Sequence, residues 1–192
     1  MSAAGGGSVD NLRGLRDRPF ELLKELEKRS RAGGVGAPAE AAAGAEWVGV
    51  AFRMGGETFL VAREETREVL GFPLAVTRIP GVKPWVKGLA NVRGQLLPMI
   101  DLRQFLGSGV AVAGRNTRVV VVHHREIPAG LMVDEVHGFR RFAEREFSAD
   151  PPPTVIRCDS FLAGAFRRGG EVWPVLSLKS LVESQSFLQA AS

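Results

Sequence analysis

Cysteine, tyrosine and long apolar runs are scarce in this sequence. It has one cysteine, Cys158, and no tyrosine among 192 residues. A single thiol cannot form an internal disulfide, which favours a reducing compartment. No stretch approaches the ~20 apolar residues of a membrane-spanning helix, and the N-terminus MSAAGGGSVD lacks the apolar core of a signal peptide. We therefore expect a cytoplasmic protein with no segment inserted into the membrane.

The sequence also lacks the residue patterns of common enzyme and metal sites. No phosphate-binding, dinucleotide-binding or nucleophile-elbow motif is present. Cys158 has no nearby histidine to act as a base, which favours a structural thiol over a nucleophile. Adjacent pairs such as Asp134–Glu135 and His123–His124 would point to opposite faces of a strand, so neither suits one site. We expect no catalytic residue, no metal and no cofactor; an enzyme that uses Cys158 is the weakest alternative.

The N-terminal region divides into three parts. Residues 1–16 are expected to be disordered, and residues 17–31, DRPFELLKELEKRSR, have the apolar spacing of an amphipathic helix with Pro19 in its first turn. Residues 32–45 are almost entirely Ala, Gly and Pro, the composition of a flexible linker. The helix could pack on its own domain or detach to bind a partner, and the sequence leaves both readings open.

From Trp47 onward the pattern indicates short β-strands. Apolar residues alternate through Met54 with period two, and Gly55-Gly56 marks a turn. Further strands and hairpins are expected at residues 58–62, 119–122, 129–136, 161–166 and 172–176. Many short strands with glycine turns favour a barrel or sandwich over a βαβ sheet.

The net charge of +4 and a pI of about 9.8 suggest an acidic partner. Together with the β-barrel pattern, they support one alternative function, a basic small-barrel RNA-binding protein. The basic residues are scattered, however, and the longest basic clusters are the pairs Arg140–Arg141 and Arg167–Arg168. A nucleic-acid surface also interleaves basic residues with exposed aromatics, and tyrosine is absent. We therefore expect no nucleic-acid partner.

The chain contains an internal repeat. Residues 88–106 match residues 164–182 without a gap, at an offset of 76. The matched pairs include Gly88 with Gly164, Gly94 with Gly170, Pro98 with Pro174 and Asp101 with Ser177. Asp101 and Ser177 are expected to cap short helices, and Gln104 predicts a capping box with Asp101. Two similar small β-barrels would leave this pattern.

Three spaced motifs carry a resemblance to a known family. Residues 88–102 read GLANVRGQLLPMIDL, residues 130–136 read GLMVDEV, and Glu68-Val69 follows the first hairpin. In this order they resemble the chemotaxis coupling proteins (CheW-like) over residues 46–184, with residues 185–192 as a tail. FRMGG in the first hairpin, PGVKPWVKGLANVRG and the ending LAGAFRRGGEVWPVLS are most similar to the twitching-motility, type IV pilus branch (PilI-like).

The resemblance implies a mainly β fold of two SH3-like five-stranded barrels that share a hydrophobic core, here with an added N-terminal helix. It also implies a non-enzymatic adaptor recruited to membrane receptor arrays. Its expected partners are the regulatory domain of a CheA-type histidine kinase and the cytoplasmic tip of a methyl-accepting, pilus-associated receptor. The output would be twitching motility by type IV pili.

The family motifs also imply site residues. Arg93 would lie in the receptor-facing groove paired with Glu68, and Asn91 belongs to the same motif, although its amide is expected mainly to stabilise the turn. Trp85, between two prolines and two lysines, is expected either at an interface or in the core. Candidates for the kinase-binding edge are Leu131, Val133, Phe139 and Phe142.

Overall fold

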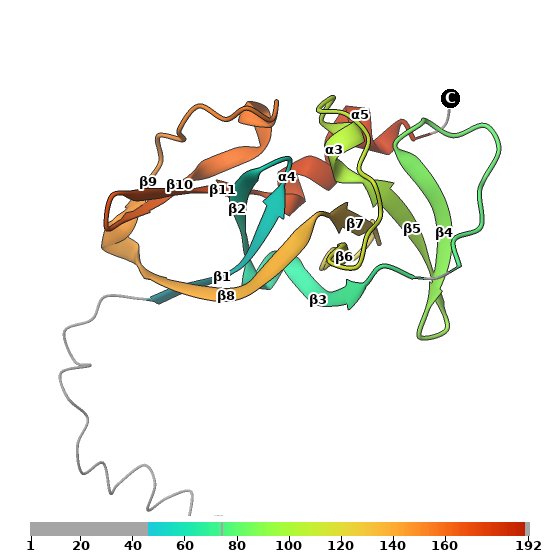
Figure 1. Ribbon diagram of the computed structural model, residues 1–192, viewed down its shortest axis with the longest axis horizontal. Coiled ribbons are helices and arrows are strands. Elements are labelled where there is room, and N and C mark those ends of the chain that lie inside the picture. Colours follow the sequence, from blue (N-terminus) through green and yellow to red (C-terminus); the bar gives the residue numbers. More distant parts are fainter. Residues whose placement is uncertain (1–45, 74, 191–192) are drawn as a thin grey trace, which may run out of the picture. The chain divides into compact units, whose positions relative to one another are not determined.

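The computed structural model describes residues 46–73 and 75–190, which form a mainly β fold with two sheets (Figure 1). The expected disordered segment 1–16, helix 17–31 and linker 32–45 lie outside the described residues. The first described strand, β1, begins at Glu46.

The first sheet has six strands in the order β8-β1-β2-β11-β10-β9. Its strands are β1 (Glu46–Met54), β2 (Glu57–Ala62), β8 (Glu135–Ala143), β9 (Phe147–Ser148), β10 (Leu162–Arg168) and β11 (Glu171–Leu176). The predicted hairpins about Gly55-Gly56 and Gly169-Gly170 are therefore β1–β2 and β10–β11.

The second sheet has five strands in the order β3-β6-β7-β5-β4. Its strands are β3 (Thr66–Gly71), β4 (Val86–Val92), β5 (Gln95–Asp101), β6 (Arg118–Val122) and β7 (Gly130–Val133). Short helical elements join or cover the strands: η2 (Arg63–Glu65), α3 (Leu102–Phe105), η3 (Glu144–Glu146), η4 (Asp159–Phe161), α4 (Leu178–Val182) and α5 (Gln185–Leu188).

The predicted strand at residues 129–136 is divided between the two sheets. β7 pairs with β6 in the second sheet, whereas β8 pairs with β1 in the first. The break falls at Asp134, whose backbone N–H donates to the carbonyl of Arg53 at 3.1 Å. The chain therefore crosses from one sheet to the other within a segment that reads as one continuous apolar strand.

The sequence repeat is also a repeat of strand pairing. Val86 pairs with Ile100 in β4–β5, and Leu162 pairs with Leu176 in β10–β11, with a bulge at the same place in each ladder. The β1–β2 hairpin matches β6–β7 at an offset of 70, since Ala51 pairs with Leu60 and Val121 with Gly130. At that offset β3 matches β8 in register as well. The two sheets thus repeat one architecture.

Gly88 and Gly164 are required by this architecture. Their φ angles are +138° and +144°. A Cβ on Gly88 would lie 2.1 Å from the carbonyl oxygen of Thr77, and a Cβ on Gly164 would lie 2.4 Å from the carbonyl oxygen of Ser148. Only glycine accepts that backbone geometry without strain. The matched glycines therefore let a neighbouring segment approach the bulged strand at the same point in each sheet.

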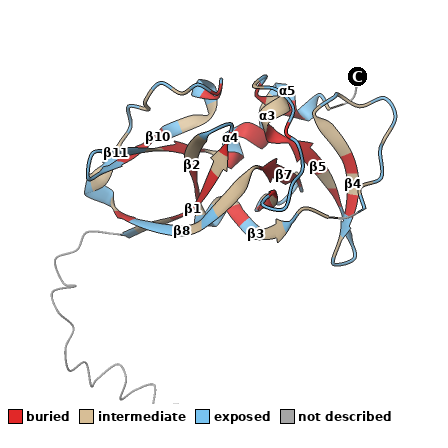
Figure 2. Cartoon of the chain, viewed as in Figure 1, coloured by how far each residue is buried: buried red, intermediate tan, exposed pale blue. Residues whose placement is uncertain are grey.

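One hydrophobic core joins the two sheets. It combines Phe52 and Phe59 of the first sheet with Leu131 and Val133 of the second, and with buried residues of α4. Each sheet also encloses a smaller cluster of its own, around Phe142 and Phe166 in the first and Met99 and Val121 in the second. Figure 2 shows buried positions on β1, β5, β7 and α4. The expected shared core is present.

The two predicted helix caps form, but the predicted capping box does not. Asp101 Oδ1 accepts from the N–H of Gln104 at 3.0 Å, and Ser177 Oγ accepts from the N–H of Ser180 at 3.2 Å. The Gln104 side chain instead accepts from Lys87 Nζ at 3.0 Å, while the Asp101 N–H donates to the carbonyl of Trp85. In the predicted capping box the Gln104 side chain would accept from the N–H of Asp101, but here Lys87 of the neighbouring strand β4 is its donor.

The C-terminal residues pack on the domain beyond residue 184, where a tail was expected to begin. Phe187 of α5 is buried, and its ring lies 5.6 Å from that of Trp85 and 5.4 Å from that of Phe105. The carbonyl of Ala190 also accepts from the N–H of Lys83. Trp85 is therefore half-buried against the core, which was one of its two predicted placements.

Candidate functional site

The β4–β5 hairpin presents Arg93 at its tip. Asn91 Oδ1 accepts from the N–H of Gly94 at 2.8 Å, as expected of a turn-stabilising amide. Arg93 has a φ of +51° and is the one non-glycine residue with positive φ in the described part of the chain. Non-glycine residues rarely adopt this left-handed conformation, so Arg93 occupies a turn position that usually holds glycine.

Arg93 forms the ion pair that the family motif implies. Its Nη2 lies 3.1 Å from Glu68 Oε2 on β3, with 79% of the Arg93 side chain exposed against 21% for Glu68. The pair links β3 to the β4–β5 turn, and β3 and β4 are the two outer strands of the second sheet. An ion pair this exposed contributes about 0–1 kcal/mol to stability. Its guanidinium remains available to a partner.

A groove of about 420 Å3 surrounds this pair, and we call it the Arg93 groove. Arg67 and Gln95 form a second polar contact across it, Nη1 to Oε1 at 3.1 Å. Val92, Leu97 and Val121 supply apolar lining. The sequence analysis did not single out Arg67 or Gln95, because the contact links residues 28 positions apart that carry no shared motif. The groove thus combines a small apolar floor with a charged rim, the composition of a protein-docking surface.

The other half of the molecule shows that the fold does not need the Arg93–Glu68 pair. The strand registers place Gly169 at the position of Arg93 and Gly138 at the position of Glu68. Both partners of the pair are glycine there, although the two sheets share strand order and bulges. The pair is therefore a feature of the surface rather than of the architecture.

The structure divides the five candidate interface residues into three that are buried and two that are accessible. Leu131, Val133 and Phe142 are at most 2% exposed and belong to the hydrophobic clusters, so they form no surface here. β7, which carries Leu131 and Val133, is buried along its whole length, and an apolar sequence run alone cannot distinguish such a strand from an exposed edge. β8 is a mostly accessible edge strand that buries only Phe142. Phe139 on the edge strand β8 is 60% exposed, with the guanidinium of Arg63 5.9 Å from its ring centre. Of the five, Phe139 and the half-buried Trp85 remain accessible.

The cysteine and the two adjacent histidines considered as reactive groups contact other residues of the fold. Burial raises the pKa of the Cys158 thiol, and the hydroxyl of Thr154 lies 3.5 Å from its sulfur. His123 contacts the carbonyl of Glu64, and His124 contacts the Glu183 carboxylate. No group of three potential metal ligands occurs in residues 46–73 and 75–190. No helix within the same ranges is long and apolar enough to cross a membrane.

Two repeated β units on a common core, with a polar groove at the outer strands of one of them, define a docking scaffold. The chain belongs to the CheW-like domain family, whose model matches residues 48–186. It is therefore a non-enzymatic scaffolding adaptor of chemotaxis-type signalling. This membership decides between the hypotheses that the sequence left open, in favour of the adaptor over the RNA-binding protein.

Similarity to individual proteins agrees with the family. The chain is 43% identical to Protein PilI of Pseudomonas aeruginosa over 90% of its own length and 96% of the relative. It is 23% identical to the chemotaxis protein CheW of Bacillus subtilis over 71% of this chain and 87% of that one. The crystal structure of scaffolding protein TtCheW from Thermoanaerobacter tengcongensis superposes with a TM-score of 0.65 and 26% identity, covering 74% of this chain and 96% of that one.

Proposed function

We propose that this chain couples the cytoplasmic tip of a methyl-accepting receptor to the regulatory domain of a CheA-type histidine kinase. It does so at membrane receptor arrays, and the array controls twitching by type IV pili. The extent and identity of the match to Protein PilI support the pilus assignment over a flagellar one. The observation that carries the receptor contact is the Arg93–Glu68 pair, which stands exposed on one half of a repeated fold and is replaced by glycine on the other.

The receptor contact is tested by reversing the charge of Arg93. In pull-downs with the purified receptor tip, Arg93→Glu should bind at least about tenfold more weakly, because a charge reversal places two carboxylates side by side at the interface. Kinase-domain binding should be unchanged. Since the pair is exposed, the free energy of unfolding should fall by no more than about 1 kcal/mol.

A matched control is Arg157→Glu, since Arg157 is exposed and lies outside the Arg93 groove. This variant should bind the receptor like the wild type. The double variant Arg93→Glu/Glu68→Arg should recover part of the lost affinity. In cells, a strain lacking the gene should lose twitching and regain it with wild type but not with Arg93→Glu. Full receptor binding by a natively folded Arg93→Glu protein would refute the assignment.

A further inference from the structure

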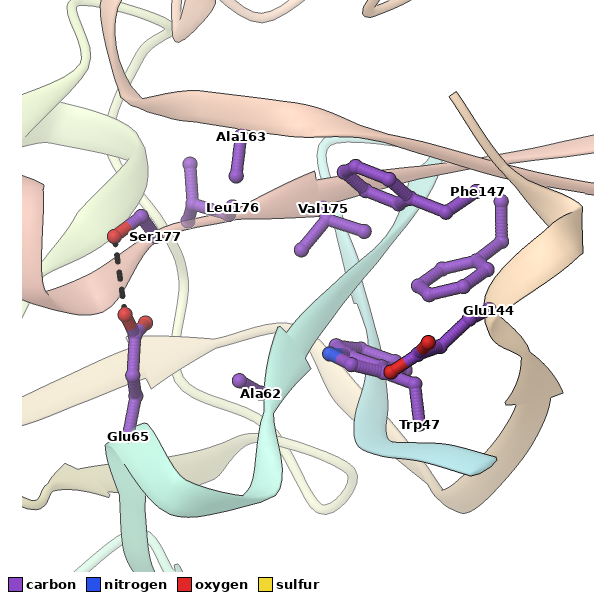
Figure 3. A pocket seen from close by; sticks show the side chains of 10 residues that line it. Trp47, Ala62, Glu65, Glu144, Phe147, Ala163, Val175, Leu176 and Ser177 are labelled. Atoms are coloured by element: carbon purple, nitrogen blue, oxygen red, sulfur yellow. Dashed lines mark hydrogen bonds between the residues drawn. The ribbon is translucent and has the colours of Figure 1, made fainter. Parts of the chain in front are cut away.

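A second groove opens on the first sheet, and we call it the Trp47 groove (Figure 3). It has a volume of about 500 Å3 and a largely apolar lining. Trp47 of β1 and Phe147 of β9 stand on one side of it, and Ala163, Val175 and Leu176 of the β10–β11 hairpin stand on the other. It shares no lining residue with the Arg93 groove. The groove is thus a separate surface from the one that carries the receptor contact.

Two carboxylates and no basic residue line the Trp47 groove. Glu65 enters from η2 and accepts from Ser177 Oγ at 3.1 Å and from the N–H of Leu178 at 2.6 Å. Each of its oxygens thus receives a single neutral donor and keeps a free lone pair. Glu144 enters from η3 and is exposed. Neither carboxylate forms an ion pair within the described part of the chain. The groove therefore has two uncompensated negative charges.

The repeat shows which side chain occupies the equivalent place in the second sheet. Residue 163 corresponds to residue 87 and residue 177 to residue 101, by the matched registers of β10–β11 and β4–β5. There Lys87 lies 3.0 Å from Asp101 and donates to Gln104. In the first sheet these positions hold Ala163 and Ser177, which are too short to fill the space. The Trp47 groove is the counterpart of a site that the chain fills elsewhere with its own lysine.

We infer that the Trp47 groove accepts a lysine or arginine side chain from the kinase regulatory domain. The aliphatic stem would lie against Trp47 and Phe147, since long basic side chains pack their methylenes on apolar surface. The cation would meet the Glu65 carboxylate beside Ser177, while Glu144, which stands beside Trp47 at the other end of the groove in Figure 3, adds negative charge where the basic side chain enters. This inference rests on the proposed function. It assigns the groove to the kinase because an adaptor needs a second surface apart from the Arg93 groove.

The test fills the groove with a lysine introduced by substitution. In the full chain, Ala163→Lys introduces at residue 163 the side chain that the repeat has at residue 87. It should weaken binding of the purified kinase regulatory domain at least about tenfold in calorimetry, with receptor-tip binding unchanged. Glu144→Lys, an exposed and fold-neutral change, should weaken the same binding about three- to tenfold. Ala149→Lys is the matched control, since residue 149 is exposed outside the groove, and should bind like the wild type.

The outcomes separate this inference from the proposed function. Unchanged kinase binding by both Ala163→Lys and Glu144→Lys would overturn the inference and leave the adaptor function standing. Loss of receptor binding instead of kinase binding would also overturn it, because the groove would then belong to the receptor surface. If the wild-type chain bound neither purified partner, both proposals would fall.

Discussion

At the scale of single residues, Asp101 is a buried charge held by three contacts at the end of β5. It is fully buried, and its carboxylate meets three donors at 3.0 Å: the N–H groups of Gln104 and Ala111 and the ammonium of Lys87. Its repeat counterpart Ser177 caps α4 with a neutral hydroxyl, and the carboxylate of Glu65 is brought in from η2 to reach the same helix start. The two halves thus place a carboxylate at the same point by different routes.

We expect Asp101→Ala to lower the free energy of unfolding by about 3 kcal/mol. The substitution leaves two N–H groups without acceptors and a partly buried ammonium without its counterion. Ser177→Ala removes the cap bond to the N–H of Ser180 and the hydroxyl donor to Glu65, but the Glu65 carboxylate still accepts from the N–H of Leu178, so the loss should be about 1 kcal/mol. Urea denaturation of the two variants provides the comparison. An equal loss for both would show that Asp101 acts only as a cap.

Among the elements, η3 is tied to β10 by one carboxylate. Glu146 accepts from Arg168 Nε at 2.7 Å and from the N–H of Ala143 at 2.7 Å. The hydrogen bonds from Arg168 and Ala143, in that order, lower the pKa of Glu146 from 4.5 to about 2. Arg168 also lies over the ring of Phe142 at 4.5 Å. These contacts hold the turn between β8 and β9 against the first sheet.

The stability that Glu146 contributes should depend on pH. Because its pKa in the folded state lies below the unfolded value, the contribution is complete above about pH 5 and is lost as the pH falls from about 4.5 towards 2. The difference in unfolding free energy between wild type and Glu146→Gln should therefore be constant from pH 7 to about pH 5.5 and shrink below that. Urea titrations at pH 7, 5, 4 and 3 measure it. A difference that grew on acidification would contradict the ion pair.

The sequence predicted the individual strands, turns and caps better than it predicted which strands pair and which distant residues come into contact. Strand periodicity, turn glycines and the offset of the repeat are local signals, and they predicted the hairpins and both caps. Which sheet each strand joins depends on contacts between distant residues. The division at Asp134, the burial of Leu131 and Phe142, and the Lys87–Gln104 bond therefore had no local signature. The Arg93–Glu68 pair was predicted because the family motifs specify it, whereas the Trp47 groove emerges only when the repeat is compared in space.

On the scale of the whole molecule, the chain order interleaves the two sheets. β1 and β2 belong to the first sheet, β3 to β7 form the second, and β8 to β11 return to the first. The main core draws residues from both sheets and from α3, α4 and α5. Neither sheet can therefore be detached without exposing the shared core.

We expect the two sheets to unfold in one transition. A variant that retains only Trp47 reports on the first sheet, and one that retains only Trp85 reports on the core beside the second. In each, tryptophan fluorescence and far-UV circular dichroism should give coincident urea midpoints, as two-state unfolding requires. An isolated fragment comprising β3 to β7 should remain unfolded. Separate midpoints, or a folded fragment, would show that the sheets are independent domains.

The shared core also limits how this adaptor can transmit a signal. Close-packed interiors deform little, and here the packed interior joins the sheet with the Arg93 groove to the sheet with the Trp47 groove. The two sheets are therefore expected to move together as one rigid body rather than to rotate against each other. If the two grooves bind receptor and kinase as proposed, a receptor movement would reach the kinase as a change in the position and tilt of an intact body. The fixed spacing between the grooves would then set the geometry of the coupling.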